Sequence, residues 1–152
     1  MDVEVRAPRG GDVEVLAELR AEVMRGDLER LGRYDEHRVR QRLLDSFSAE
    51  HSSVLVARGQ VVGCFTVRPD GDGLLLEHFI VAAEHQGRGI GSRLLRGLLE
   101  RADAQWMDVR LNVLRGSAAQ RLYERYGFAV EAQDEVDVFM VRAAGTVVRE
   151  SP

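Results

Sequence analysis

The 152-residue sequence predicts an α/β sandwich with a mixed, mostly antiparallel sheet, a central parallel strand pair and helices on both faces. Three observations predict it. Hydrophobic residues recur with a helical period in some segments and a two-residue period in others. A strand, a helix and another strand follow one another in mid-chain, which favours a right-handed parallel crossover. A glycine-rich stretch, "QGRGIGS", separates the first of these strands from the helix.

The first third of the chain reads as one short strand and two helices. "VEVRAP" alternates and ends at Pro8, which is typical of a short strand. Asp12 is the predicted N-cap of a helix that Gly26 should end. After a polar connection, the apolar residues Val39, Leu43, Leu44 and Phe47 predict a second amphipathic helix that ends near Ser48.

The rest of the chain supplies the sheet and two more helices. "SSVLVAR" and "VVGCFTVRP" read as a hairpin around Gly59-Gln60, and "LLLEHFIV" as a strand buried on both faces. A helix follows the glycines, and "WMDVRLNV" is the next strand. "SAAQRLYERY" is a short helix, with a capping box from Ser117 to Gln120 and an end at Gly127. "FAVEAQ" and "VDVFMVRA" close the sheet.

Composition excludes several classes of protein. Hydrophobic residues make up 45% and charged residues 30%, so we expect one globular domain over residues 1–144 and a loose tail over 145–152. A net charge of −4 argues against nucleic acid, and no apolar run is long enough for a membrane span. The single cysteine, Cys64, fits a reducing cytoplasm, and no metal-ligand spacing occurs. All 21 basic residues are arginine.

The glycine segment predicts an anion site at a helix N-terminus. A Walker loop needs a lysine, which the chain lacks, and the sixth position of a dinucleotide fingerprint is occupied by Ser92 or Leu94 instead of glycine. The remaining pattern is Gln-x-x-Gly-x-Gly at Gln86, Gly89 and Gly91. Backbone amides from about Gly87 to Ser92 can then converge on a pyrophosphate. The alternative is a loop that needs glycine only to turn tightly.

Two signatures give the chain its resemblance to the GNAT superfamily of acyl-CoA-dependent N-acetyltransferases. One is the strand ending at Val81, followed by the Gln-x-x-Gly-x-Gly segment. The other is Leu-Tyr-x-x-x-Gly-Phe at Leu122, Tyr123, Gly127 and Phe128. Two departures stand beside them: Gly116-Ser117 replaces the usual Asn-Pro, and Ala83 stands where proline is frequent.

The resemblance implies acetyl-CoA as donor and assigns residues to it. The strand at Phe79 and Val81 would pair with the pantetheine arm, and the helix N-terminus would hold the pyrophosphate. The residues implied in coenzyme binding are Phe79, Val81, Gln86, Gly87, Arg88, Gly89, Ile90, Gly91, Ser92, Ser117 and Tyr123. The acceptor pocket would use Tyr34, Asp35, Glu36 and His37, for which a solvated polar loop is the equal alternative.

The resemblance also implies a direct transfer of the acetyl group to an amine in a ternary complex. Tyr123 would protonate the leaving thiolate, although its place on an apolar helical stripe also fits a core residue. Glu77, an ionisable group in an apolar strand, would take the amine proton, or be a structural carboxylate; His78 is the weaker candidate base. We expect a small amine as acceptor. A protein N-terminus or lysine, a non-catalytic acyl-CoA sensor and a homodimer stay open.

Overall fold

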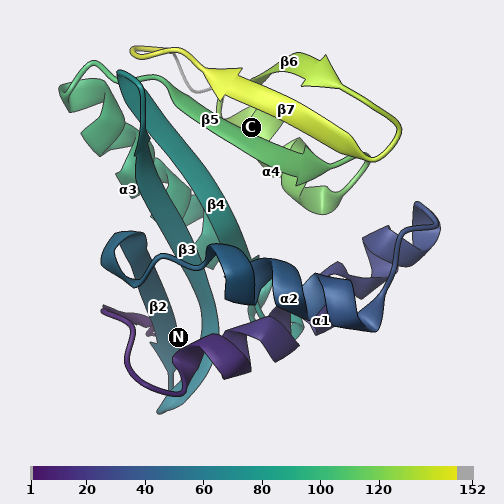
Figure 1. Cartoon of the computed structure of the whole chain (residues 1–152). Helices are drawn as coiled ribbons and strands as arrows, with labels where there is room; N and C mark the ends of the chain where they lie inside the picture. Colours follow the sequence, from purple (N-terminus) through teal and green to yellow (C-terminus); the bar gives the residue numbers. More distant parts are fainter. Residues whose placement is uncertain (1, 147–152) are drawn as a thin grey trace. The chain divides into compact units, whose positions relative to one another are not determined.

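The computed structural model describes residues 2–146, over which the chain forms a mixed α/β fold (Figure 1). The α-helices are α1 (Asp12–Arg30), α2 (Glu36–Ser46), α3 (Ile90–Ala104) and α4 (Ala118–Arg125). Two 3-10 helices, η1 (Ala49–His51) and η2 (Ala83–His85), lie in the connections. The strands are β1 (Glu4–Arg6), β2 (Ser52–Ala57), β3 (Gln60–Asp70), β4 (Gly73–Val81), β5 (Val109–Leu114), β6 (Ala129–Gln133) and β7 (Asp137–Arg142).

The seven strands form one sheet in the order β1-β2-β3-β4-β5-β7-β6. β4 and β5 run parallel, with Leu74–Leu76 opposite Val109–Leu111, while β1 with β2, β2 with β3, β5 with β7 and β6 with β7 are antiparallel. α3 forms the crossover between the parallel strands. The predicted fold class, a mostly antiparallel sheet with one central parallel pair, is confirmed.

The described residues divide into two compact units. Within the described residues, the first combines 2–67 with Glu77–Ile90, and the second combines Arg68–Leu76 with 91–146. The single domain predicted for residues 1–144 stays a prediction. Of the predicted loose tail, Gly145 and Thr146 are described and bonded, since Gly145 N donates to Asp103 and Thr146 O accepts from Arg142; residues 147–152 lie outside the described residues.

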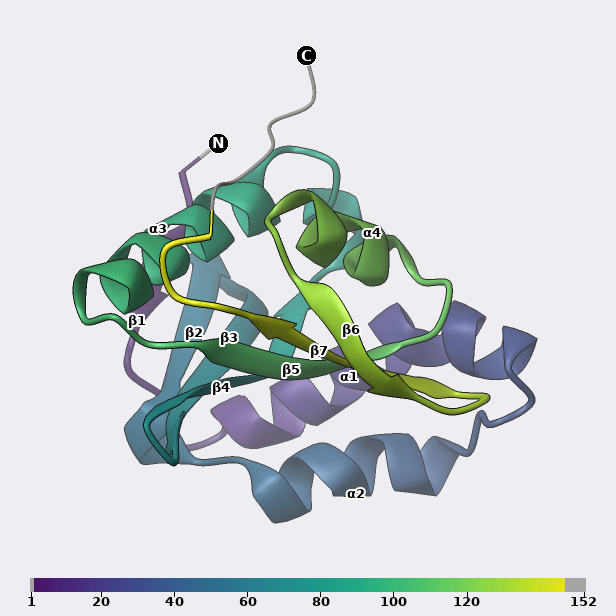
Figure 2. The same ribbon diagram turned by 90° about the horizontal axis from the view of Figure 1, so that it is seen from above.

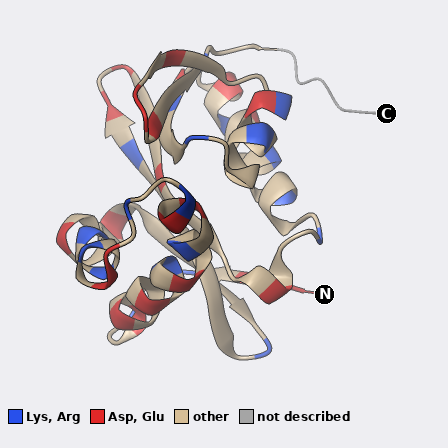
Figure 3. Cartoon of the chain, turned by 90° about the vertical axis from the view of Figure 1, so that its right-hand side faces the viewer, with Lys and Arg blue, Asp and Glu red and all other residues tan. Residues whose placement is uncertain are grey.

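In the first unit, α1 and α2 lie side by side over the strands β1 to β3 (Figure 2). Arg40 of α2 joins Glu18 of α1 by an ion pair of 2.7 Å, and both helices carry acidic and basic residues intermixed on their outer surface (Figure 3). Apolar side chains from the helices and the strands close the core between them. Those with no exposed surface are Leu16, Leu43, Val54, Leu55 and Cys64.

In the second unit, a buried arginine joins three elements. Arg142 of β7 is 1% exposed and makes a bidentate ion pair with Asp103 of α3, at 2.8 and 3.0 Å. Its Nε donates to Tyr126 O, at the C-terminus of α4. Because a buried guanidinium needs acceptors, these contacts fix β7, α3 and α4 to one another. The apolar core around them includes Leu95, Leu99, Val109, Val138 and Met140.

Several predicted boundaries were wrong. α1 runs through Gly26 to Arg30, and its N-cap is Gly11, whose φ is 89°. Asp12 does not cap the helix with its side chain, because its carboxylate accepts from Arg9 N and pairs with Arg6. α2 begins at Glu36, earlier than its apolar residues suggest, because Asp35 caps it. β5 is shorter than predicted and starts at Val109.

Candidate functional site

The glycine segment forms an open turn before α3. Gly87 and Gly89 have φ values of 76° and 79°, a conformation that side chains rarely adopt. A Cβ built on either glycine would have no protein atom within 4 Å. Packing inside the chain therefore does not require bare backbone here, whereas the turn does. The turn leaves open space beside the backbone, and a pyrophosphate would need such space to reach it.

The residues around the two glycines have different surroundings. Gln86 Nε2 donates to Val81 O at 2.8 Å, so this side chain ties the end of β4 to the turn. Ile90 is 3% exposed, which leaves only its backbone for a ligand. Gly91 and Ser92 lie in the first turn of α3, where N–H groups have no acceptor within the helix. Arg88 is exposed.

The second half of β4 departs from a regular strand. His78 has a φ of 49°, which breaks the two-residue alternation between Glu77 and Phe79. Its carbonyl accepts from Cys64 Sγ at 3.2 Å, and its Nε2 lies 2.8 Å from Ser46 Oγ. In a regular strand, Glu77 would share a face with Phe79 and Val81, but the positive φ of His78 means that alternation alone does not place it there.

Burial further distinguishes the residues of this half-strand. Glu77 Oε1 is sealed from solvent, which agrees with a carboxylate inside an apolar strand. Phe79 packs on Phe65 with ring centroids 6.2 Å apart, and Val81 is 9% exposed.

On the neighbouring strand β3, burial raises the pKa of the Cys64 thiol to about 12. Cys64 is therefore a buried, uncharged residue at neutral pH rather than a nucleophile.

The predicted acceptor residues lie at the start of α2. Asp35 caps the helix, with Oδ1 accepting from His37 N at 3.0 Å and Arg38 N at 2.9 Å. The hydrogen bond from Arg38 N, with a smaller one from His37 N, lowers the pKa of Asp35. Tyr34 stacks under Arg25, whose Cζ is 4.9 Å from the ring centroid. Glu36 and His37 are exposed.

The α4 residues lie in the second unit. Ser117 is the N-cap, and its Oγ accepts from Gln120 N at 3.1 Å, as predicted. Gln120 Oε1 accepts from Gly116 N, so the return bond of the capping box is displaced by one residue. Tyr123 is 5% exposed and its ring lies 5.5 Å from that of Phe128. Burial raises the pKa of the Tyr123 phenol, which therefore stays protonated at neutral pH.

The structure thus groups the predicted site residues by unit. The first unit contains Tyr34, Asp35, Glu36, His37, Glu77, Phe79, Val81, Gln86, Gly87, Arg88, Gly89 and Ile90; the second contains Gly91, Ser92, Ser117 and Tyr123. Sequence reasoning missed Arg20, whose side chain is buried in the first unit. A signal for it existed, since Arg20 follows Leu16 and Ala17 at helical spacing and so falls on the apolar stripe of α1.

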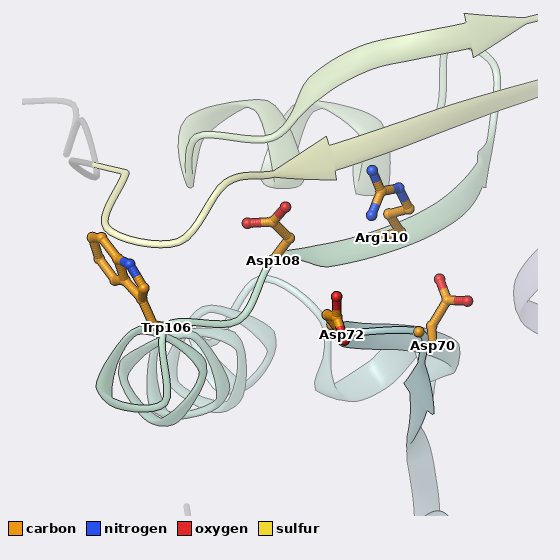
Figure 4. A pocket seen from close by; sticks show the side chains of 7 residues that line it. Asp70, Asp72, Trp106, Asp108 and Arg110 are labelled. Atoms are coloured by element: carbon orange, nitrogen blue, oxygen red, sulfur yellow. The ribbon is translucent and has the colours of Figure 1, made fainter.

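An open cavity of about 540 Å³ lies elsewhere, in the second unit. Figure 4 shows Asp70, Asp72 and Asp108 around it, with Trp106 and Arg110. None of the predicted site residues lines this cavity. Within residues 2–146 no group of histidine, cysteine and carboxylate side chains could hold a metal ion. Over the same residues, no helix has the length and apolar character to cross a membrane.

Comparison with known proteins assigns the family. The Acetyltransferase (GNAT) domain family matches residues 50–130, which is more than half of the chain. The chain therefore belongs to the GNAT acetyltransferase family, and acetyl-CoA is the donor that this family uses. No curated protein sequence matches the chain.

Solved structures share the fold at low sequence identity. The chain is similar to the PaiA N-acetyltransferase of Thermoplasma acidophilum in complex with coenzyme A, with a TM-score of 0.74, 21% identity and coverage of 94% of this chain and 99% of that one. It is similar to the ribosomal-protein-S18-alanine N-acetyltransferase of Escherichia coli, with a TM-score of 0.70, 15% identity and 96% coverage of both. It is also similar to N-acetylglutamate synthase of Neisseria gonorrhoeae, complexed with coenzyme A and N-acetyl-glutamate. That similarity has a TM-score of 0.63 and 21% identity, and it covers 96% of this chain and 36% of that one.

Proposed function

We propose that the protein transfers the acetyl group of acetyl-CoA to a primary amine by direct attack in a ternary complex. The observation that carries the proposal is the turn at Gly87 and Gly89, whose positive φ angles and open surroundings leave bare backbone before α3. Membership of an acetyltransferase family supplies the reaction class. The N-terminus of α3 would hold the pyrophosphate through its unpaired amides and its dipole.

The chemistry needs one proton removed and one supplied. The amine nitrogen attacks the thioester carbonyl carbon, the C–S bond breaks, and the electron pair leaves on the coenzyme sulfur. Keeping a lysine-like amine neutral at pH 7 costs about 4.6 kcal/mol, which a base or a desolvating site offsets. The tetrahedral oxyanion needs an N–H donor, for which Val81 N is the candidate.

Glu77 and Tyr123 are the candidates for the two proton transfers. Glu77 takes the proton from the attacking amine, directly or through a water, and its partly sealed carboxylate supports this role. Tyr123 gives its proton to the departing thiolate. Its buried phenol is compatible with this role, because a raised pKa keeps the proton on the hydroxyl at neutral pH.

The acceptor defines the main alternatives. A protein N-terminus is supported by the similarity to the S18-alanine N-acetyltransferase, although 15% identity carries only the fold. A non-catalytic acyl-CoA sensor would keep the glycine turn but would need neither Glu77 as a base nor Tyr123 as an acid. We favour a small amine as the acceptor.

The test combines ligand binding with thiol release. Acetyl-CoA should raise the melting temperature, and a panel of small amines, an alanine-ended peptide and a lysine peptide should be compared for acetyl-CoA-dependent release of free thiol. In the Gly89→Ala variant, acetyl-CoA should lose most of its effect on the melting temperature. Gly59→Ala is the matched control, because Gly59 also has a positive φ of 74° and open surroundings, in the β2–β3 turn.

The outcomes separate the alternatives. Stabilisation by acetyl-CoA without thiol release from any acceptor would favour the sensor, and release with the peptides alone would favour a protein acetyltransferase. Stabilisation by ATP or NADH and not by acetyl-CoA would overturn the proposal. Cys64 should not disturb the assay, because its buried thiol, with a pKa raised to about 12, stays unreactive in the folded protein.

A further inference from the structure

Arg20 is a charged side chain buried in the first unit. The residue is 8% exposed and lies on the stripe of α1 that packs toward α2 and the sheet. Its Nη1 donates to Val39 O of α2 at 2.6 Å. A guanidinium carries five N–H donors in a planar fork, so this bond uses one of them. Four donors of Arg20 have no acceptor among residues 2–146.

Arg20 also has no counter-ion among the described residues, since no carboxylate lies within 4.0 Å of it. The charged groups that act on it are another cation, Arg42, and the thiol of Cys64. Burial, with a smaller effect of Arg42, lowers the pKa of Arg20 to about 10, so the side chain is still charged at neutral pH. Buried arginines are almost always paired, because an isolated buried charge is costly.

The unused donors open onto accessible space. The nitrogens of Arg20 are not among the side-chain atoms that are sealed from solvent without a hydrogen bond. Because Nε and Nη2 have no acceptor among residues 2–146, each of them keeps some surface that water can reach. The fork is therefore held by one backbone bond and by burial of its stem, with its remaining donors directed at no protein group of the described chain.

The surroundings of Arg20 connect it to the half of β4 that carries Glu77. Cys64, whose charge state Arg20 influences, donates from Sγ to His78 O, and His78 directly follows Glu77 in the chain. Ser46 of α2 lies against the ring of His78. Arg20, Arg42 and the proposed base all belong to the first unit.

We propose that Arg20 binds a carboxylate of the acceptor, which makes amino acids the substrate class. This inference rests on the proposed function. It specifies that the acceptor carries a carboxylate in addition to its amine. A carboxylate matches the planar fork with two parallel hydrogen bonds, and Arg42 adds a second positive charge nearby. An acceptor that has an amine but no carboxylate would leave both arginines without an anion, whereas an amino acid would supply one.

The experiment compares each acid with its own amide. Glycine, β-alanine, 4-aminobutyrate and glutamate are each assayed beside the corresponding carboxamide, with thiol release from acetyl-CoA as the signal. For at least one pair, we expect kcat/KM to favour the carboxylate by about 10–100-fold, as a charge-assisted hydrogen bond predicts. The preference should appear in KM, because the carboxylate contact is the same before and during transfer.

Arg20→Met tests the residue itself. The variant should reduce the preference to less than about threefold while leaving kcat for the carboxamide and the acetyl-CoA melting shift unchanged. The fold should survive, because replacing an unpaired buried charge with an apolar side chain of similar length is often neutral or stabilising. Arg40→Met is the matched control, since Arg40 pairs with Glu18 on the outer surface and should keep the preference.

Three results would overturn the proposal. The first is equal kcat/KM for every acid and its amide in the wild type, and the second is an unchanged preference in Arg20→Met. The third is an equal loss for acid and amide, which would make Arg20 structural. If Arg20→Met does not fold, the wild type decides the question: the carboxylate, with coenzyme A present, should raise the melting temperature more than its amide does. A failure of the proposed function would look different, because no amine would then release thiol.

Discussion

Individual side chains of this protein acquire their chemical character from burial. Tyr123 and Cys64 are both weak acids held away from water, and burial raises the pKa of each. For Cys64 the consequence is inertness, because only the thiolate is nucleophilic. For Tyr123 the consequence is a retained proton, which is what a general acid needs. The same physical effect thus makes Cys64 unreactive and keeps the Tyr123 phenol protonated at neutral pH.

The role of Tyr123 is tested by Tyr123→Phe. Only the hydroxyl is removed, so packing against Phe128 remains and the acetyl-CoA melting shift should persist. We expect kcat to fall by about 10²–10⁴-fold, the usual contribution of a general acid. Tyr126→Phe is the control, because Tyr126 is a buried tyrosine on the same helical stripe, 6% exposed. Equal and small losses in both variants would assign Tyr123 to the core.

The role of Glu77 is tested by a pH–rate profile. Glu77→Gln keeps the shape of the side chain but cannot take a proton. Its kcat/KM should fall most near neutral pH and recover as pH rises, because more of the amine is then already neutral. Glu100→Gln, an exposed position on α3, should follow the wild-type profile. Parallel profiles for Glu77→Gln and wild type would transfer the role to another group or to desolvation of the amine.

At the scale of elements, glycines act in opposite ways. Gly26 lies inside α1 with no atom within 4 Å of an added Cβ and no positive φ, so the helix tolerates it at a cost. Gly63 lies in β3, where an added Cβ would collide with the Ile80 carbonyl of the neighbouring strand. Close approach of two backbones explains the second glycine, whereas nothing in the structure requires the first.

Two alanine substitutions should therefore shift stability in opposite directions. Gly26→Ala should raise the free energy of unfolding by about 0.5–1 kcal/mol, the difference in helix propensity. Gly63→Ala should lower it by about 1–3 kcal/mol or more, as overpacking does. Urea titrations followed by circular dichroism measure both. A stabilised Gly63→Ala variant would mean that β3 and β4 can move apart without loss.

At the scale of the whole molecule, arginine–aspartate pairs join different elements in both units. Arg6 and Asp12 join β1 to α1 in the first unit, at 2.7 Å. Arg142 and Asp103 join β7 to α3 in the second. The hydrogen bond from its arginine is the largest cause that lowers the pKa of each aspartate below its usual value of 3.8. These pairs link folding to pH.

The sign of this linkage predicts acid sensitivity. A carboxyl whose pKa is lowered by folding stabilises the protein above its unfolded value of 3.8 and loses that contribution as pH falls through the folded value. The free energy of unfolding should therefore drop as pH is lowered from 5 to about 3. Asp103→Asn should be less stable at pH 7, by about 1–3 kcal/mol, and should show a shallower drop. Urea titrations across that pH range provide the measurement.

The exposed aspartate of an ordinary helix pair serves as the control. Asp27 pairs with Arg30 on the surface of α1, so Asp27→Asn should change stability by less than about 0.5 kcal/mol and keep the wild-type pH dependence. If Asp103→Asn had the same pH dependence as wild type, the Arg142 pair would not contribute to acid sensitivity.

The sequence by itself determined the order of elements, the parallel crossover, the family and the helix cap at Ser117. These features follow from hydrophobic period, turn chemistry and short motifs, which act between residues close together in the chain. The open glycine turn before α3 belongs to the same group, because Gly87 and Gly89 carry their conformational freedom in their own identity.

The tertiary structure alone decided where local rules are overridden. α1 continues through Gly26 to Arg30, and α2 packs against this helix, with an ion pair between Glu18 and Arg40. His78 adopts a positive φ inside a strand, where its carbonyl meets Cys64. Arg20 falls on the apolar stripe of α1, but only the folded structure shows that it has no carboxylate partner among residues 2–146 and bonds to Val39 O of α2. Each outcome depends on groups far apart in the chain, whose contacts only the folded structure defines.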